Sequence, residues 1–460
     1  MEKAYTFKGI LTQDGWLENV TVKIDSLGNI ISIEAHSTIQ SEQVDGYALP
    51  GFQNAHSHAF QYAMAGLAEL HEGIGTPDDF WSWRNAMYNL ALTVSPEQLE
   101  AIAAMLYTEM VRHGYTAVAE FHYLHHDKDG KAYSNLAELG ERLVSAAQQA
   151  GIHITLVPMF YQQGGFGKPA EEKQRRFISK TIDDYYNLLE SSEEATKNYK
   201  NANIGIGIHS LRAVKGEDIK TLCENLNGEL PFHIHVSEQL KEIEDSIAFY
   251  GKRPIQWLLD NCNVDSNYHL VHATHLDDSE VKGIALSKAN VVLCPSTEGN
   301  LGDGLFCFND YKELGGNWSI GTDSHVGLNP FEELRILDYG QRLTTHKRNT
   351  FFNLNKGDSG FNAIEMAYKA GKKAMGKNNN AFFEVGQSFD AVVMNAQMPL
   401  IASSSTKNLC NTFVYSSDVS NILGTIINGE WINKSGVQKN YSDISGRFTK
   451  ALHELGTRKF

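Results

Sequence analysis

Short apolar stretches alternate with longer segments of helical periodicity through the middle of the chain, from about residue 50 to 380. The apolar stretches have the length of buried strands, and the spacers contain amphipathic segments such as Pro96 to His113 and Asn135 to Ala150. Eight strands separated by helices predict a parallel (β/α)8 barrel of the α/β class. The predicted strands are 53–58, 116–121, 152–160, 204–209, 231–237, 268–273, 290–294 and 318–323.

Both ends of the chain carry short strand-like segments instead. Residues 21–24 and 30–33 flank a turn in which Gly28 can adopt a positive φ, and Asn428-Gly429 is a hairpin signal near the other end. Two strand-rich ends around a long middle suggest one small β-domain assembled from both. We expect a β-sandwich from residues 1–48 and 385–440, the barrel from residues 49–384, and a C-terminal helix from residues 441–460.

Composition narrows the range of partners. Of the 460 residues, 42% are hydrophobic and 21% are charged, as in an ordinary globular protein, and the formal net charge is −15. This charge argues against general nucleic-acid binders and polybasic membrane binders, which need an extended positive surface. It does not exclude an acidic small-molecule substrate, because a few arginines inside a pocket reverse the local sign.

Signals of secretion and membrane insertion are not found in the sequence. No run of about 18 apolar residues occurs, and the N-terminal segment has no basic stretch followed by an apolar one. The five cysteines are scattered and form no Cys-x-x-Cys pair. We therefore expect a cytoplasmic protein with free thiols. The cysteines are Cys223, Cys262, Cys294, Cys307 and Cys410.

Polar side chains follow the ends of four predicted strands. The first strand ends in His56-Ser57-His58, and alternate residues of a strand point to the same side, so both imidazoles can bind one metal. Each such residue alone is more often a structural polar group, and His-x-His alone is weak evidence. Together the strand ends meet at the barrel face where catalytic groups gather. On strands five, six and eight these residues are His235, Glu238, His272 and Asp323.

This arrangement resembles the amidohydrolase superfamily over both the barrel and the domain made from the chain ends. In the mononuclear deaminase branch, a His-x-His pair, a strand-five histidine and a strand-eight aspartate bind one metal. That branch has no carboxylated lysine on strand four, and residues 205–210 contain no lysine. The resemblance implies one divalent metal per chain, for which zinc suits the ligands best and iron is chemically feasible. The implied ligands are His56, His58, His235 and Asp323.

Metal chemistry then suggests three catalytic residues. The metal lowers the pKa of its water molecule, and Asp323 can accept the proton that this water loses. Glu238 can pass a proton to the substrate nitrogen as general acid and base. His272 can polarise or stabilise the oxygen of a tetrahedral intermediate.

Three longer stretches are more specific than the metal ligands: Phe-Trp-Ser-Trp-Arg at 80–84, Ala-Glu-Phe-His-Tyr-Leu-His-His-Asp at 119–127, and Ser-Thr-Glu-Gly-Asn-Leu-Gly-Asp-Gly at 296–304. They resemble the N-formimino-L-glutamate deiminases of histidine degradation. This resemblance implies a homodimer that hydrolyses a dicarboxylate amidine to N-formyl-L-glutamate and ammonia. Arginine suits the substrate carboxylates because its guanidinium forms paired hydrogen bonds with a carboxylate. The implied substrate-binding residues are Gln61, Arg84, Tyr123, His209 and Arg212.

Other functions stay open from the sequence. A related deaminase could act on a different acidic amidine or on a heterocycle, whose flat ring would stack on aromatic side chains such as Trp81 or Trp83. A barrel without catalysis could serve as an assembly scaffold, although such proteins typically lose metal ligands and all four are present here. His122, His125 and His126 suggest a second metal, yet two adjacent histidines cannot easily face one ion from a strand.

Overall fold

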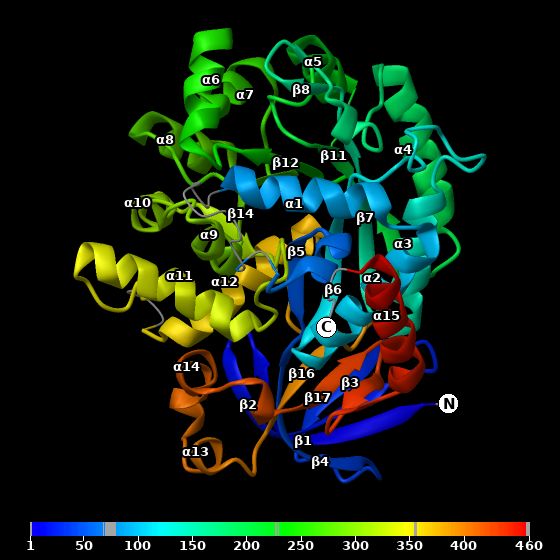
Figure 1. The fold of residues 1–460 in the computed structure, drawn as a ribbon. Helices are drawn as coiled ribbons and strands as arrows, with labels where there is room; N and C mark the ends of the chain where they lie inside the picture. Colours follow the sequence, from blue (N-terminus) through cyan, green and yellow to red (C-terminus); the bar gives the residue numbers. More distant parts are fainter. Residues whose placement is uncertain are drawn as a thin grey trace.

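A parallel barrel and a second sheet built from both chain ends make up the computed structural model (Figure 1). The structure describes residues 2–67, 69, 80–225, 228, 230–353 and 357–456. Within these ranges, no helix is both long enough and apolar enough to cross a membrane.

Eight parallel strands follow one another around the barrel in chain order, which confirms the predicted (β/α)8 fold. Each strand is buried along nearly its whole length, as expected when side chains fill the barrel on one face and pack under helices on the other. A parallel bridge between Ser57 and Asp323 brings the last strand against the first. The strands are β5 (Phe52–Ser57), β6 (Tyr115–His122), β7 (His153–Phe160), β11 (Ile206–Ile208), β12 (Phe232–Val236), β13 (Tyr268–His272), β14 (Asn290–Leu293) and β15 (Asn317–Ile320), with β10 (Ala202–Ile204) paired to β7.

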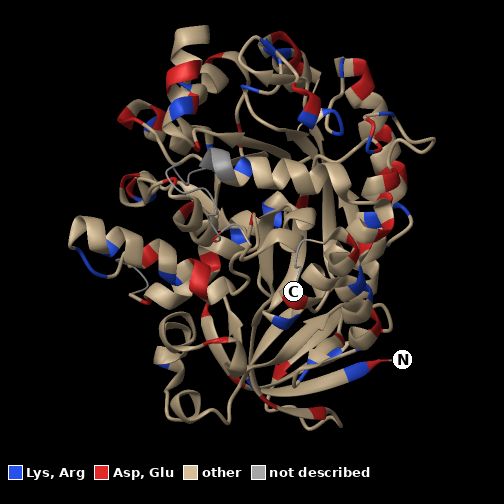
Figure 2. Ribbon diagram, in the orientation of Figure 1, with Lys and Arg blue, Asp and Glu red and all other residues tan. Residues whose placement is uncertain are grey.

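Helices surround the barrel, and α2 (Pro96–Arg112) illustrates how the sequence starts them. The backbone N–H of Gln98 donates to the Ser95 hydroxyl at 3.2 Å, and the Ser95 N–H donates to the Gln98 side chain at 3.0 Å. This capping box satisfies N–H groups that the first helical turn leaves without partners. Figure 2 shows that charged residues concentrate on the helices and loops, while the barrel strands carry few.

The remaining helical and hairpin segments of the barrel lie between its strands. They are η1 (Ala59–Met64), α1 (Phe80–Thr93), α3 (Glu138–Ala150), β8 (Gln163–Gly165), β9 (Lys168–Pro169), η2 (Glu172–Gln174), α4 (Ile182–Thr196), α5 (Gly216–Asn225), α6 (Leu240–Tyr250), α7 (Pro254–Asn261), α8 (Asp278–Ser287), α9 (Pro295–Leu301), α10 (Phe308–Glu313), α11 (Pro330–Thr345) and α12 (Ser359–Ala374).

The second sheet joins the two ends of the chain in the strand order β19-β18-β17-β16-β4-β1-β2-β3. The sheet curls over its own apolar face. The ring centroids of Tyr5 on β1 and Trp431 on β18 are therefore only 6.3 Å apart, although three strands separate β1 from β18 in the sheet. Gly28 has a φ of 96° in the turn before β3, as its position predicts. The strands are β1 (Lys3–Thr12), β2 (Gly15–Ile24), β3 (Ile30–Ala35), β4 (Glu42–Pro50), β16 (Ala391–Asn395), β17 (Ile422–Ile427), β18 (Glu430–Lys434) and β19 (Val437–Gln438).

Helices near the C-terminus connect this sheet to the barrel. The last helix, α15, lies against α2, where the Gln98 amide donates to Glu454 at 3.2 Å. Phe448 of α15 also stacks on Tyr62 at 5.5 Å between ring centroids. These helices are α13 (Pro399–Ala402), α14 (Thr406–Ser416), η3 (Val419–Asn421) and α15 (Tyr441–Leu455).

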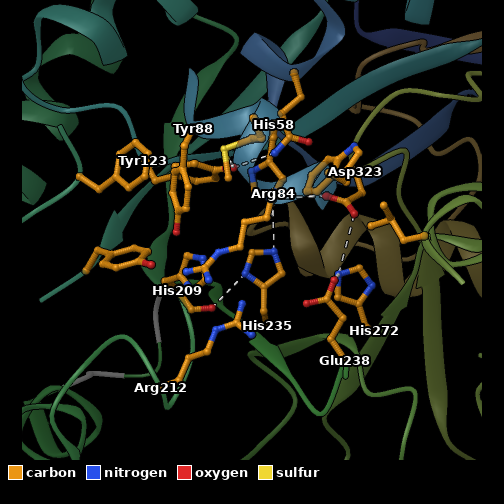
Figure 3. Close-up of a pocket in the computed structure, with 16 residues that line it drawn as sticks. His58, Arg84, Tyr88, Tyr123, His209, Arg212, His235, Glu238, His272 and Asp323 are labelled. Carbon is orange, nitrogen blue, oxygen red and sulfur yellow. Dashed lines mark hydrogen bonds and ion pairs between the residues drawn. The ribbon is translucent and has the colours of Figure 1, made fainter. Parts of the chain in front are cut away.

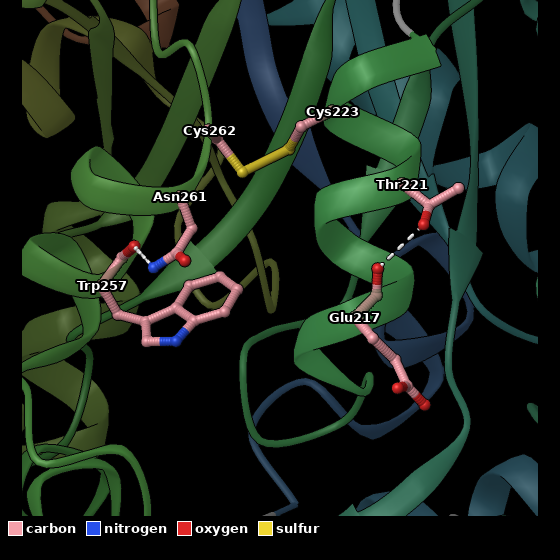
Figure 4. The surroundings of a disulfide bond; sticks show 6 residues. All are labelled: Glu217, Thr221, Cys223, Trp257, Asn261 and Cys262. Carbon is pink, nitrogen blue, oxygen red and sulfur yellow. Dashed lines mark hydrogen bonds between the residues drawn. A yellow bond between two sulfur atoms is a disulfide. The ribbon is translucent and has the colours of Figure 1, made fainter.

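Two of the five cysteines are paired, which makes the expectation of five free thiols wrong. Cys223 lies in the last turn of α5, Cys262 directly follows α7, and the two form a disulfide (Figure 4). Their helices follow the neighbouring strands β11 and β12, so the barrel brings together two positions 39 residues apart. Cys294, Cys307 and Cys410 are free.

Candidate active site

Three histidines and one aspartate converge at the C-terminal end of the barrel. The Nε2 atoms of His56, His58 and His235 are 3.1–3.3 Å apart, and Asp323 Oδ1 lies 3.3 Å from Nε2 of both His56 and His58. All four residues are buried. A tetrahedral ion bound at about 2.0–2.1 Å separates neighbouring nitrogen ligands by about 3.3–3.4 Å. The four side chains therefore fit one divalent metal, with the donor atoms expected for zinc.

The other ring nitrogens explain how His58 and His235 are oriented. The Nδ1–H of His58 donates to the Phe121 carbonyl at 2.7 Å, and that of His235 donates to the His209 carbonyl at 2.9 Å. These bonds leave Nε2 as the nitrogen that can bind a metal. Burial lowers the pKa of His56 to about 3 and also lowers the pKa values of His58 and His235, so the rings stay neutral.

Buried polar side chains hold the end of β5, which carries His56 and leads into His58. Glu120 of β6 accepts hydrogen bonds from the Ser57 hydroxyl at 2.6 Å and from the Ala59 N–H at 2.7 Å. On the other side, Asn54 donates to the Thr322 hydroxyl at 2.7 Å and accepts from the Thr322 N–H at 3.0 Å. Sequence reasoning assigned these residues no role. A glutamate inside an otherwise apolar strand was the signal that could have identified Glu120.

The backbone around the site is unusual for non-glycine residues. Five residues at or just after the ends of β12, β13 and β15 have φ between 44° and 67°. Residues other than glycine rarely adopt this backbone conformation. Such local strain clusters at functional sites, where the surrounding structure holds it in place. These residues are Ser237, His272, Ala273, Asp323 and His325.

Three carboxylates surround His272, which lies beside the metal-binding residues. His272 Nε2 lies 3.7 Å from Glu238 and 3.9 Å from Asp323 (Figure 3). On the other side of the ring, Nδ1 lies 3.2 Å from Glu298. Burial alone would lower the pKa of His272, but these carboxylates raise it to about 10, so the ring is an imidazolium at neutral pH. Glu298 was not predicted as a site residue, although it lies in the 296–304 stretch.

Burial also changes the carboxylates of this group. It raises the pKa of Glu238, against the opposing effect of His272 and Arg212. Burial and the charge of Glu238 raise the pKa of Asp303 to about 8. A carboxyl group with a raised pKa can hold a proton near neutral pH, which suits proton transfer.

The five predicted substrate-binding residues line the same pocket as these groups. Gln61 donates to the Tyr123 hydroxyl at 2.7 Å, and His209 Nδ1 lies 2.9 Å from the Ser210 hydroxyl. In Figure 3, Arg84 and Arg212 lie on the opposite side of His235 from Glu238 and His272. Among the described residues, the buried Nε of Arg212 has no hydrogen-bond partner. The pocket therefore has an acidic end and a basic end.

The aromatic and histidine alternatives can be placed as well. Trp83 lines the pocket, whereas the Trp81 side chain lies outside the described part of the structure. His125 donates to the Met159 carbonyl at 3.0 Å, and His126 donates to the Ile178 carbonyl at 2.8 Å. Each of these two rings uses Nε2 to hold a separate carbonyl, so they do not form one ligand set with His122.

Known proteins resemble this chain in sequence and fold. The amidohydrolase family matches residues 47–432. Formimidoylglutamate deiminase of Pseudomonas aeruginosa is 42% identical over 448 residues, which cover 97% of this chain and 98% of that protein. The crystal structure of an amidohydrolase from Brucella melitensis has 39% identity and a TM-score of 0.92, and covers 98% of this chain and 99% of that one. An adenosine deaminase from Xanthomonas campestris with bound zinc shares the fold, with a TM-score of 0.80, 19% identity, and coverage of 99% and 98%.

Proposed function

This chain belongs to the amidohydrolase family, and from that premise we propose that it hydrolyses N-formimino-L-glutamate to N-formyl-L-glutamate and ammonia. The reaction is a step of histidine degradation. Close identity to a formimidoylglutamate deiminase along nearly the whole chain supports the substrate. The charge arrangement of the pocket supports it independently.

One observation carries the proposal: metal-binding and proton-transfer side chains gather at one end of the pocket, and two arginines line the other. Glu238, Glu298 and Asp323 surround His272 at one end, while Arg84 and Arg212 line the other. N-formimino-L-glutamate has a basic formimino group at one end and two carboxylates towards the other. Its two carboxylates face the arginines when the formimino carbon lies beside the metal-binding residues.

Each residue at the acidic end has a chemical task in this proposal. A bound metal, for which we propose zinc held by His56, His58, His235 and Asp323, supplies an activated water molecule at neutral pH. Asp323, whose Oδ1 lies 3.3 Å from His56 and whose Oδ2 lies 3.9 Å from His272, would help to hold the metal and would accept a proton from the attacking water. Glu238 gives a proton to the departing nitrogen. The His272 imidazolium stabilises charge on the oxygen that adds to the formimino carbon.

The basic end selects the rest of the substrate. Arg84 and Arg212 bind the carboxylates, since a guanidinium can donate two parallel hydrogen bonds to one carboxylate. Gln61, Tyr123 and His209 contribute neutral donors. Burial, together with Arg212 and Arg84, lowers the pKa of His209, so it stays neutral beside these arginines.

Metal analysis and an ammonia assay test the proposal together. We expect one metal per chain and ammonia release from N-formimino-L-glutamate. A heterocycle deaminase is the second candidate, because Trp83 lines the pocket. One metal per chain with turnover of guanine or cytosine, and none of formimino-glutamate, would favour that candidate. A chain without metal and without ammonia release would favour a scaffold.

We also propose that the enzyme works as a cytoplasmic homodimer. The resemblance to bacterial deiminases of histidine degradation supports both points. Light scattering coupled to gel filtration checks the assembly state, and a mass equal to one chain at micromolar concentration would contradict it.

A further inference from the structure

A second cavity adjoins the catalytic pocket. It has a volume of about 580 Å³ and lies between the β8–β9 hairpin and α6. Arg84 and Arg212 line both this cavity and the catalytic pocket. We call this second cavity the antechamber. A ligand that occupies it lies directly beside the two arginines of the catalytic pocket.

The antechamber is positive in a protein that is negative overall. Five cationic and three acidic side chains line it, whereas the whole chain has a net charge of −15. The local sign is therefore opposite to that of the average surface. A cavity with walls of low dielectric concentrates such a field and attracts ligands of opposite charge. The cations are Arg84, Lys168, Lys173, Arg212 and Lys241.

Each acidic side chain of the antechamber contacts a neighbouring group. Lys173 pairs with Glu171 at 3.2 Å, and Lys241 pairs with Asp245 at 2.9 Å. Glu242 accepts a hydrogen bond from the Glu238 N–H at 3.1 Å and is buried, so it turns away from solvent. The five cations and three carboxylates leave two positive charges in excess, although Glu242 lies near Arg212. Lys168 on β9 and Lys241 on α6 are exposed.

The cations form a path from the hairpin into the catalytic pocket. The Lys173 ammonium lies 5.1 Å from the centre of the Tyr88 ring, and the Arg84 guanidinium lies 5.0 Å from the same centre. Tyr88 also lines the catalytic pocket. An anion can therefore move from the mouth of the antechamber to Arg84 without leaving the neighbourhood of a positive charge.

We propose that the antechamber is the approach route of the acidic substrate, and that Lys168 and Lys241 speed its capture by electrostatic attraction. This inference rests on the proposed function for the choice of a dicarboxylate ligand. The two lysines act at a distance and do not touch the reacting atoms. Their effect is thus expected on kcat/KM and on association, with kcat unchanged.

Charge reversal of the two lysines tests this role in the full-length, metal-loaded enzyme. At low ionic strength, the K168E/K241E variant should lower kcat/KM for N-formimino-L-glutamate by about tenfold and leave kcat within about twofold. The loss should disappear towards about 1 M salt, where the Debye length falls to about 3 Å. A loss that is equal at every salt concentration, or that falls on kcat, would overturn the proposal.

The control variant is K439E/K450E, which changes the net charge by the same amount. Both control lysines are exposed and lie at or near α15, outside the antechamber lining. Lys450 faces Glu454 four residues later, as Lys241 faces Asp245. The control should keep wild-type kcat/KM at all salt concentrations. The same loss in both variants would assign the effect to total charge and overturn the proposal.

Association of the product separates this inference from the proposed function. Binding of N-formyl-L-glutamate can be followed by stopped-flow tryptophan fluorescence, because Trp83 lines the pocket. Slower association in K168E/K241E at low salt supports the antechamber, even if formimino-glutamate is not turned over. Normal turnover with unchanged association in the variant overturns the inference alone. A wild-type enzyme that neither binds nor turns over these dicarboxylates overturns both.

Discussion

The barrel carries a histidine–aspartate pair at each of its ends, buried at the C-terminal end and half-buried at the N-terminal end. At the C-terminal end, Asp323 meets His56 and His58 at 3.3 Å, and their nitrogens converge with that of His235 on one point. At the N-terminal end, His153 at the start of β7 pairs with Asp390 at 3.2 Å, just before β16 of the second sheet.

Electrostatics alone does not separate the two pairs. Burial acts to raise the pKa of each aspartate, but neighbouring histidines outweigh it and hold the pKa of Asp323 and of Asp390 well below the usual range. The difference lies in the partners. Asp390 also accepts hydrogen bonds from the Ser388 hydroxyl at 2.8 Å and the Asn428 N–H at 2.7 Å. Asp390 is surrounded by hydrogen-bond donors, so it connects the barrel to the second sheet. At Asp323, by contrast, several electron-pair donor atoms point to one position, which indicates a metal site.

The largest expected difference between the two pairs is the loss of activity when each aspartate is replaced by asparagine. Asp323→Asn should lose the metal and lower turnover by roughly 10³-fold or more, because it removes a ligand and a proton acceptor. Asp390→Asn should keep kcat within about threefold. Ammonia release and elemental analysis of both variants check this. Retention of metal and of turnover within about tenfold in Asp323→Asn would contradict the assignment.

Glu238→Gln tests whether proton transfer can be lost at the C-terminal site while the metal is kept. Turnover should fall by roughly 10²–10⁴, since the amide cannot exchange a proton with the substrate nitrogen. The metal content should stay at one per chain, because Glu238 is outside the ligand set. Steady-state ammonia release at saturating substrate measures the effect. Near-normal turnover in this variant would remove Glu238 from the mechanism.

Substitution of the two arginines tests whether the basic end of the pocket binds the substrate carboxylates. Arg84→Met and Arg212→Met should each lower kcat/KM by roughly 10–100-fold, mainly through KM, because a charge-assisted hydrogen bond contributes about 1.5–3 kcal/mol. Arg447→Met on α15 is the matched control and should leave both constants unchanged. An equal loss in kcat with an unchanged KM would place the arginines in the chemical step instead.

The N-terminal pair should affect stability and its pH dependence, the smallest of these effects. The pKa of Asp390 in the folded state lies below its unfolded value of about 3.9. The pair therefore stabilises the fold above about pH 4, and this contribution is lost as the pH falls further. Asp390→Asn should lower the free energy of unfolding by about 1–3 kcal/mol at neutral pH.

Urea unfolding of the wild type and Asp390→Asn from pH 7 down to about pH 3.5 measures this difference. The gap between the two proteins should narrow below about pH 4, because the wild-type carboxylate begins to be protonated in the unfolded chain. A gap that is constant over this range would show that the ionised form of Asp390 contributes nothing.

Much of the barrel could be predicted because its signals are local. The eight predicted strands agree with the structure to within about four residues at their ends, since apolar strands separated by amphipathic helices have a clear periodicity. The pairing of His56 with His58 also follows from local geometry, because residues two apart on a strand share a face. The closeness of His235 and Asp323 followed from the barrel topology.

The supporting contacts could not be predicted in this way, because they join distant segments. Glu120 holds a loop 63 residues earlier, and His153 finds Asp390 in another sheet. The Cys223–Cys262 disulfide depends on how α5 and α7 pack. The two cysteines are 39 residues apart, so no local motif such as Cys-x-x-Cys indicates that they pair. Each partner is an ordinary polar or sulfur-containing residue in its own segment, and only the folded backbone brings the pairs together.

Hydrolysis of N-formimino-L-glutamate in water labelled with a heavy oxygen isotope tests the central claim most directly. Mass spectrometry of the products shows which carbon–nitrogen bond breaks and where the water oxygen goes. The account predicts one ammonia per substrate and N-formyl-L-glutamate with one labelled oxygen in its formyl group. Labelled formamide together with unlabelled glutamate, or recovery of unchanged substrate from the metal-loaded enzyme, would contradict it.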